Sequence, residues 1–229
     1  MLAVSDEVDQ GLLAGAESVR TADLILACGD LPLDYLSSLM NALATPLTFV
    51  PGNHDPDLSG YRLSRSGMLL RAGLPAHPPW PTGAFNVDGQ ILDVAGLRVA
   101  GLGGCLRYRN GPNQYTERQQ AGRARALRRR ARWRALQAGR GIDVLITHAP
   151  PRGVGDGEDP ANRGFACYHD LVAAIRPRAL LHGHVEPQPG GPARRQLGRT
   201  AVRNVTGWHL LEIGPDGVTS LIPGRRRAI

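Results

Sequence analysis

The sequence predicts an α/β protein whose first third alternates strands with helices. Three short apolar runs, Leu2–Ser5, Leu24–Ala27 and Leu47–Val50, end in polar or glycine residues and are typical of buried parallel strands. Between them, Gly11–Arg20 and Leu33–Ala44 have the spacing and length of helices. This βαβαβ order predicts a parallel sheet covered by helices, with ligands at the carboxyl ends of its strands.

The rest of the chain returns to this alternation after a stretch that is richer in strands. Phe85–Gly104 contains strand-like runs around Asp88-Gly89 and Ala95-Gly96, which indicate hairpins of a second sheet. The elements expected after it are a helix at Thr116–Ala138, a strand at Ile142–Ile146, a helix at Phe165–Ile175, a strand at Ala179–Leu181 and closing antiparallel pairs within Ala201–Ile213. No internal repeat is found, and we expect one domain over residues 1–229.

Composition excludes several classes of protein. Hydrophobic residues make up 42% and charged residues 21%, as in a folded globular chain, and no apolar stretch is long enough to span a bilayer, so no membrane partner is expected. The first residues, Met1–Asp6, lack the features of a signal peptide, which predicts a cytoplasmic protein. Cys28, Cys105 and Cys167 are far apart and are expected to be reduced structural thiols.

The net charge of +7 is compatible with nucleic-acid binding, because clustered cations attract phosphates. All 27 basic residues are arginine, a bias that coding preference can also produce. Within the long predicted helix, arginine occupies positions 123, 125, 128, 129, 130, 132 and 134, with Trp133 as the one interleaved aromatic residue. Because these arginines fall on every side of the helix, we favour a solvated face over a nucleic-acid contact.

Five short motifs place side chains that can bind metal where predicted strands stop. Each contains a carboxylate, an amide oxygen or an imidazole, the donors that Mn²⁺, Mg²⁺, Fe or Zn²⁺ prefer. In chain order the motifs are Ser5-Asp6-Glu7-Val8, Gly29-Asp30, Gly52-Asn53-His54-Asp55, Thr147-His148-Ala149-Pro150-Pro151 and Gly183-His184-Val185-Glu186. A lone Gly-Asp is usually a turn, so the information lies in all five occurring in one order.

In this order of motifs the chain resembles the calcineurin-like metallophosphoesterases over almost its whole length. The resemblance implies a four-layer αββα sandwich, in which two mixed sheets are flanked by helices. It also implies that Asp30 bridges two metal ions, and that Asn53, His148 and His184 complete one of the two sites. That site is intact in this sequence.

The second metal site departs from the pattern of the family. Asp6 and the bridging Asp30 are present, but the two further histidines of the family fall on Val8 and Glu186. Valine cannot ligate, whereas a carboxylate in place of an imidazole favours harder ions such as Mn²⁺ or Mg²⁺. We therefore expect divalent cations as cofactors, Mn²⁺ before Fe, Zn²⁺ or Mg²⁺, with one firm site and one weaker site.

The mechanism that the resemblance implies needs no protein nucleophile. Two cations roughly 3.5–4 Å apart can generate hydroxide for in-line attack on phosphorus. His54, next to Asn53, is expected to assist the departing oxygen. In much of the family an aspartate orients this histidine, but its position is Leu33 here, and we assign the orienting role to Asp34.

For contact with the substrate, the glycine-rich segment Gly101–Tyr108 and the nearby Tyr115 are the candidates, because glycine lets backbone approach a ligand. Arg107 is expected to clamp phosphate oxygens, and Tyr108 or Tyr115 to stack on a base.

These residues predict a metal-dependent phosphoric ester hydrolase acting on a small-molecule or nucleotide phosphoester. Phosphodiesters are preferred, because a positive protein suits nucleotide or polyanionic substrates. A binding or scaffold protein that keeps the fold but has lost catalysis through Val8 and Glu186 is the first alternative, and a nuclease is the second. The complete Gly52-Asn53-His54-Asp55 motif favours the enzyme, because a scaffold has no need for His54.

Overall fold

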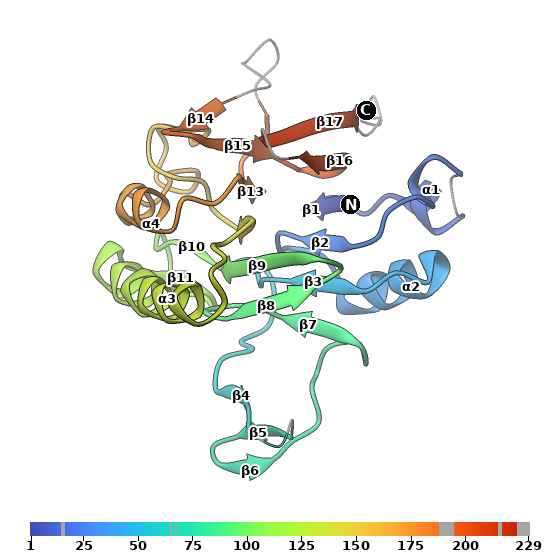
Figure 1. The fold of residues 1–229 in the computed structure, drawn as a ribbon, viewed down its shortest axis with the longest axis horizontal. Helices are drawn as coiled ribbons and strands as arrows, with labels where there is room; N and C mark the ends of the chain where they lie inside the picture. The colour runs from blue at the N-terminus through green and yellow to red at the C-terminus, as the bar shows by residue number, and fades with distance from the viewer. Residues whose placement is uncertain (15–16, 65, 67, 188–194, 215–216, 224–229) are drawn as a thin grey trace.

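The computed structural model contains two six-stranded mixed sheets with helices on their outer faces (Figure 1). It describes residues 1–14, 17–64, 66, 68–187, 195–214 and 217–223. Its helices are α1 (Gln10–Leu13), α2 (Leu33–Leu43), α3 (Glu117–Ala138) and α4 (Cys167–Ile175), with a 3-10 turn at Glu17–Val19.

The first sheet holds the N-terminal strands in the order β17-β16-β1-β2-β3-β7. Its strands are β1 (Leu2–Ser5), β2 (Ile25–Ala27), β3 (Leu47–Phe49), β7 (Ala84–Asn86), β16 (Gly207–Gly214) and β17 (Gly217–Pro223). β1, β2, β3 and β7 run parallel, while β16 is antiparallel to β1 and β17 to β16. The parallel strands therefore end at one edge, where the first three motifs begin.

The second sheet has the order β14-β15-β13-β12-β9-β8. Its strands are β8 (Ile91–Val94), β9 (Leu97–Leu102), β12 (Val144–Thr147), β13 (Ala179–His182), β14 (Arg195–Leu197) and β15 (Thr200–Asn204). The four central strands, β9, β12, β13 and β15, are parallel, and the two edge strands are antiparallel to their neighbours. The last two motifs follow β12 and β13.

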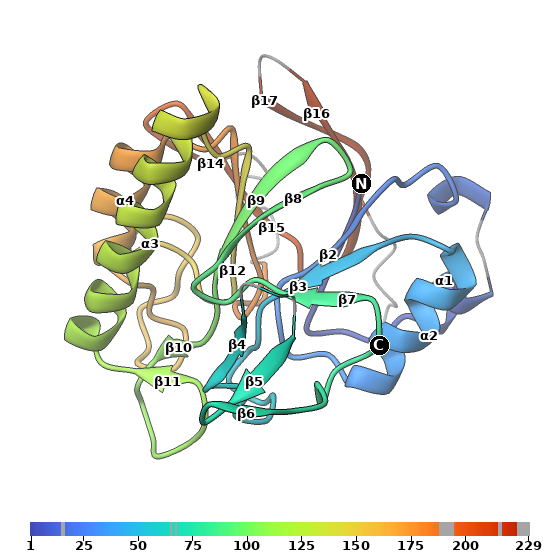
Figure 2. The same ribbon diagram turned by 60° about the horizontal axis from the view of Figure 1, so that its bottom comes forward.

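The two sheets pack face to face, so that the molecule has four layers (Figure 2). The interior between the sheets consists of aliphatic side chains and a cysteine, among them Leu26, Val99 and Ile146. A second core lies where α2 covers the first sheet, and a third where α3 and α4 cover the second sheet. The four-layer αββα sandwich expected from the resemblance is thus confirmed.

The long helix α3 has well-formed ends. The Thr116 hydroxyl accepts the Gln119 N–H, and the Gln119 side chain accepts the Thr116 N–H in return, which is a capping box. Gly139 follows the last turn in the left-handed region, with φ of 62°. The predicted helix at Thr116–Ala138 therefore begins and ends where the local chemistry satisfies its backbone.

A small three-stranded sheet projects from the body of the molecule between β3 and β7 (Figure 1). It comprises β4 (Tyr61–Leu63), β5 (Leu69–Arg71) and β6 (Leu74–Pro75). Trp80 packs edge-on against both Phe49 of β3 and Tyr61 of β4, and so joins the projection to the first sheet. A parallel pair, β10 (Cys105–Leu106) and β11 (Gln114–Tyr115), stands near the start of α3.

Three expectations about elements were wrong in detail. Asp88-Gly89 is no hairpin turn, because β7 pairs with β3 in the first sheet while β8 and β9 form a hairpin in the second. Ala201–Ile213 does not form one antiparallel pair, because β15 and β16 belong to different sheets. The helix expected at Gly11–Arg20 is a short α1 and a 3-10 turn, with residues 15–16 outside the described part. Apolar spacing identifies a strand but not the sheet in which it pairs.

Among the helices of the described residues, none has the length and apolar character needed to cross a bilayer.

Removing a leucine side chain from the layer between the sheets should destabilise the protein strongly. Leu26 has no exposed surface, so Leu26→Ala should lower the free energy of unfolding by about 2–5 kcal/mol, through lost burial and the cavity left behind. Urea denaturation followed by circular dichroism measures this. Leu136→Ala on α3 is the matched control, because that side chain is 76% exposed and its loss should change stability by less than about 0.5 kcal/mol. Equal losses in both variants would contradict the layer assignment.

Candidate metal centre

The five motifs come together at the carboxyl ends of strands from both sheets. Asp6, Asp30 and Asn53 follow β1, β2 and β3 of the first sheet, and His148 and His184 follow β12 and β13 of the second. Ligand atoms of Asp30, His148 and His184 all lie within 4.8 Å of one another. Because the sheets pack face to face, residues far apart in the sequence meet across one interlayer edge.

His148 is the centre of this cluster. Its side chain is fully buried, and its Nε2 lies 3.0 Å from Asn53 Oδ1 and 3.2 Å from Asp30 Oδ2. Its Nδ1 lies 2.8 Å from the carbonyl oxygen of Cys28 in the first sheet. Three oxygen atoms therefore surround one imidazole.

This arrangement fits a bound cation. A neutral imidazole has one N–H, and the carbonyl of Cys28 can only accept, so Nδ1 carries the hydrogen and donates it. Nε2 faces the oxygens of Asn53 and Asp30, which are electron-rich, so a proton or a cation must lie between Nε2 and these oxygens. Without a cation a proton takes this place, as the raised pKa of His148 indicates. A divalent cation held by these three atoms would replace that proton, and the Cys28 carbonyl keeps the other hydrogen on Nδ1, as ligation through Nε2 needs.

His184 lies beside His148, with the two ring centroids 4.8 Å apart. Its Nε2 lies 2.7 Å from the carbonyl oxygen of Ala161, to which it donates, so its Nδ1 is left without a hydrogen. Its backbone N–H donates to both carboxylate oxygens of Asp6, at 3.0 and 3.2 Å. A carbonyl thus orients each histidine ring, as in many metal sites.

Burial and mutual interaction shift the pKa values of His148, His184 and Asp30. Burial disfavours the charged form of His148, but the hydrogen bond and charge of Asp30 outweigh it and raise the pKa of His148 above its usual range. For His184, burial and then the charge of His148 lower the pKa to about 4, which leaves its ring neutral and able to ligate. Burial opposes ionisation of Asp30, yet the hydrogen bond from His148 brings its pKa below the ordinary value.

The backbone is strained at three of these positions. Asp6, Asp30 and His184 have φ of 63°, 57° and 69°, in the left-handed region that residues with a side chain rarely adopt. Such strain persists where the surroundings impose it and gathers at functional sites.

Three candidate ligands follow a glycine, Gly29, Gly52 or Gly183, because the chain there passes too close to its neighbours for a side chain. A Cβ on Gly52 would clash with Asp30 Oδ1, and one on Gly183 would clash with Ser5 Oγ. Each glycine therefore lets one motif touch another.

Comparison with known proteins agrees with this geometry. A sequence profile described as calcineurin-like phosphoesterase matches residues 8–186. The chain belongs to the calcineurin-like phosphoesterase family. It matches none of the curated proteins with which it was compared.

Solved structures share the fold of this phosphoesterase. One crystal structure has a TM-score of 0.63 and 15% sequence identity, covering 97% of this chain and 98% of its own. The crystal structure of TT1561 from Thermus thermophilus has a TM-score of 0.59 and 17% identity, with 96% of each chain covered. At these identities the likeness concerns the fold alone.

The residues expected to form a second, weaker metal site do not gather as the first set does. Asp6 is half-buried, and burial raises the pKa of its carboxyl group. The carboxylate oxygens of Asp6 accept the His184 N–H and do not belong to the cluster of three ligand atoms. Glu186 is exposed, and Val8 is 44% exposed with no side-chain atom that could ligate. The assignment of Asp6 and Glu186 as ligands of a weaker site stays a prediction.

His54 is exposed at the edge of the cluster, and its backbone N–H donates to Asp30 Oδ1 at 2.8 Å. Asp34 is exposed at the start of α2, where its Oδ1 accepts the backbone N–H of Tyr35 at 2.9 Å. Among the described residues, no hydrogen bond joins Asp34 to His54. The orienting role of Asp34 therefore stays a prediction that the observed bonds do not support.

Arg107 and Tyr115, the expected substrate contacts, are engaged within the protein. The Arg107 guanidinium donates to the Gln114 carbonyl at 3.2 and 3.3 Å and to Gln119 Oε1 at 3.3 Å. The Tyr115 ring lies 4.1 Å from the guanidinium carbon of Arg123. A substrate contact by either residue stays a prediction, and Arg107 would have to give up these bonds to make one.

Sequence reasoning missed three residues that hold the Asn53 loop in place. Asp55 Oδ2 accepts the backbone N–H of Gly52 at 2.7 Å and that of Asp30 at 3.0 Å, so it clamps two motifs together. Asn113 donates to the Gly52 carbonyl at 2.8 Å, and the Tyr108 hydroxyl accepts from Asn53 Nδ2 at 3.3 Å. Asp55 could have been found from its motif, whereas Asn113 and Tyr108 have no local signal.

Divalent cations should stabilise the phosphoesterase through this cluster. A cation at about 100 times its Kd adds about 2.7 kcal/mol to the free energy of unfolding, so Mn²⁺ should raise the Tm of the wild type. His148→Ala and Asn53→Ala should each reduce this shift, because each removes a ligand atom. His77→Ala, a histidine outside the cluster, is the control and should keep it. An unchanged Mn²⁺ shift in both cluster variants, measured by calorimetry, would refute the assignment.

The Asp55 clamp should control metal affinity without contacting the metal. Asp55→Ala leaves two backbone N–H groups unsatisfied and frees the Asn53 loop, so Mn²⁺ affinity should fall about 10- to 100-fold. Isothermal titration with Mn²⁺ measures this. Asp57→Ala is the control, because Asp57 accepts the exposed Ser59 N–H, and its Mn²⁺ affinity should match the wild type. A clamp role is excluded if both variants bind Mn²⁺ equally well.

Proposed function

We propose that this protein is a divalent-cation-dependent phosphodiesterase with weaker action on phosphomonoesters. The observation that carries the proposal is the convergence of His148 Nε2, Asn53 Oδ1 and Asp30 Oδ2, with exposed His54 held at its edge. Family membership supports a hydrolase of phosphoric esters, and the net positive charge of the protein favours diesters among them.

Asp30, Asn53, His148 and His184 are the residues that would hold the cation. When bound, a divalent cation supplies a water of lowered pKa as nucleophile and offsets negative charge on the phosphoryl oxygens. The protein contributes the positioning of these four groups, which the two carbonyls and the Asp55 clamp fix in advance. The departing oxygen is left in need of a proton.

His54 is the group we assign to that proton. Its backbone is tied to Asp30, so the side chain stands at the edge of the metal cluster, and it is exposed to an incoming ester. A histidine in this position can act as a general acid, a role worth about 10²- to 10⁴-fold in rate.

Phosphodiesters are favoured on grounds of charge. The protein has a net charge of +7, which suits nucleotide or polyanionic substrates. Mn²⁺ is the cation we expect, because carboxylate and amide oxygens make up half of the four-residue donor set.

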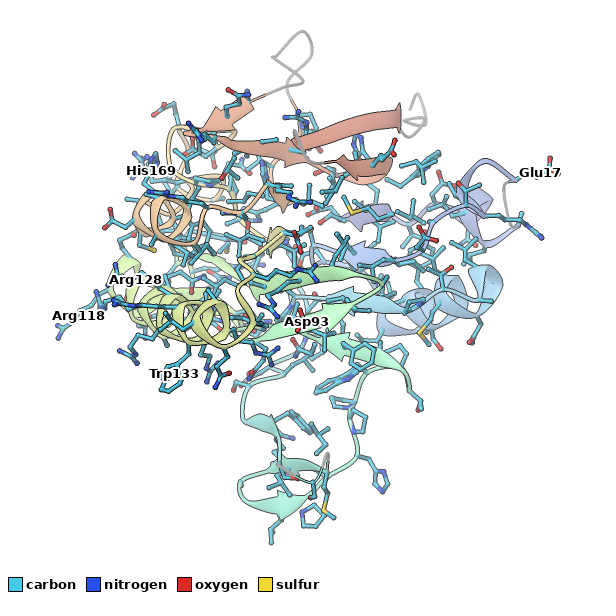
Figure 3. All side chains as sticks on the ribbon, in the orientation of Figure 1. Glu17, Asp93, Arg118, Arg128, Trp133 and His169 are labelled. Atoms are coloured by element: carbon cyan, nitrogen blue, oxygen red, sulfur yellow. The ribbon has the colours of Figure 1, made fainter. Side chains whose placement is uncertain are left out.

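The arginines of α3 do not by themselves favour a nuclease. Arg123 binds Asp88, Arg130 binds the Gly89 carbonyl and Arg134 binds Asp93, so these three hold α3 to the β8–β9 region. Arg118 and Arg128 extend outward from α3, and Trp133 lies on the outer surface with 66% exposure (Figure 3). Several arginines are thus structural, and the nuclease stays an alternative.

The decisive measurement is hydrolysis of bis(p-nitrophenyl) phosphate and p-nitrophenyl phosphate with and without Mn²⁺. We expect Mn²⁺-dependent cleavage, faster for the diester. His54→Ala should lower kcat by about 10²- to 10⁴-fold for an ester with a poor leaving group, and by less for these aryl esters, because p-nitrophenolate departs readily without a proton. Mn²⁺ affinity should stay unchanged, because His54 acts on the leaving group. His184→Ala should lose both activity and Mn²⁺ affinity.

Three results would count against the proposal. Wild-type rates in both variants would sink the site assignment. Mn²⁺ binding without hydrolysis of either ester would favour the scaffold alternative. Cleavage of oligonucleotides at rates well above those for the aryl diester would favour the nuclease.

A further inference from the structure

The loop between β10 and β11 carries an arginine, Arg109, whose guanidinium rests on an aromatic ring. Arg109 is exposed, and its guanidinium makes no hydrogen bond or ion pair with another described residue. This contrasts with Arg107 in the same loop, whose guanidinium is held by Gln114 and Gln119. Of the two arginines, Arg109 is therefore the one available to bind an anion.

Arg109 is connected to the metal cluster through Tyr108. Its guanidinium carbon lies 5.3 Å from the centre of the Tyr108 ring, and the hydroxyl of that ring accepts from Asn53 Nδ2. A cation stacked on an aromatic ring is held in place by the ring electrons, with the hydrogen-bonding edges of the guanidinium left available. Tyr108 thus fixes the amide of a candidate metal ligand and supports the guanidinium of Arg109.

The backbone of the loop is held in place before any ligand arrives. The Gln114 side-chain oxygen accepts the Arg109 N–H at 3.2 Å and the Tyr108 N–H at 3.4 Å. Asn113, at the end of the loop, donates to the carbonyls of Gly52, Asp55 and Pro56. The same contacts that place Asn53 therefore also place the loop that carries Arg109.

A guanidinium suits phosphate better than a point charge does, because its planar fork can donate two parallel hydrogen bonds to two oxygens of one phosphate. The Tyr108 ring, on which the Arg109 guanidinium rests, contacts Asn53 through its hydroxyl and so places that guanidinium on the Asn53 side of the cluster. An available guanidinium thus stands near the cluster on the Asn53 side.

We propose that Arg109, supported on the Tyr108 ring, forms a subsite that binds the non-bridging oxygens of the substrate phosphate beside the metal cluster. This assignment rests on the proposed function for the identity of the ligand, a phosphoric ester, but not for its existence as an anion site. Binding of the phosphate oxygens, the role expected for Arg107 from the sequence, is thereby assigned to Arg109.

The test compares three substitutions that each remove one positive charge in Mn²⁺-loaded protein. Arg109→Gln should raise KM for bis(p-nitrophenyl) phosphate about tenfold and change kcat less than about threefold, a loss of about 1.4 kcal/mol in binding. Arg107→Gln tests the competing assignment. Arg118→Gln is the control, because Arg118 extends from the outer surface of α3 and its loss should leave both constants within about twofold (Figure 3).

Binding of inorganic phosphate, measured by isothermal titration, gives a readout that needs no turnover. Arg109→Gln should weaken it about tenfold while Mn²⁺ affinity stays at the wild-type value, which separates loss of the subsite from loss of the metal. If the wild type hydrolyses neither ester but Arg109→Gln still weakens phosphate binding, the subsite stands and the proposed function falls. Wild-type phosphate affinity in Arg109→Gln, or a loss confined to Arg107→Gln, overturns the subsite.

Discussion

The contact of His148 with the opposite sheet is the interaction on which the rest of the site depends. Its ring leaves the second sheet, bonds the Cys28 carbonyl of the first and brings Nε2 to Asp30 and Asn53. An imidazole can reach this far only if the sheets lie close together. The layer between them meets that need, because its buried core consists of aliphatic residues such as Val50, Val99 and Ala179, with no aromatic side chain among its described members.

Holding the donors in place has a cost that the surrounding structure must offset. Left-handed backbone at a residue with a side chain costs on the order of 1–3 kcal/mol, and Asp6, Asp30 and His184 all adopt it. Each of these three residues lies shortly after a buried strand, so the packed chain before and after it imposes the left-handed conformation. The hydrogen bonds of Asp55 then fix the spacing between the Gly-Asp and Gly-Asn-His-Asp motifs. The strained residues of the site are thus anchored to the sheets by their neighbours and by these bonds.

The site is asymmetric in composition and in burial. On the Asn53 side, buried donors are held by carbonyls and by the loop between β10 and β11. On the Asp6 side, the two residues expected at the positions of the family's further histidines are an exposed valine and an exposed glutamate. The arginines also differ in what their guanidinium groups contact. Those of α3 that bind residues of the β8–β9 region stabilise the fold, whereas Arg109 rests on an aromatic ring. These differences support the proposal of one firmly held cation, with the Arg109 guanidinium beside it, and of a weaker second site.

The sequence by itself determined the strands that precede the five motifs, the long helices and the order of the motifs, because apolar periodicity, capping residues and glycines are local properties. Those motifs resemble a known family, and this resemblance correctly predicted the four-layer sandwich. Tertiary structure alone decided that β7 and β16 join the first sheet, and that Asn113 and Tyr108 hold Asn53. It also decided which arginine side chains have hydrogen-bond or ion-pair partners within the protein. Such pairings depend on contacts between residues distant in the chain, and no local pattern encodes which partner a strand edge or a polar side chain will meet.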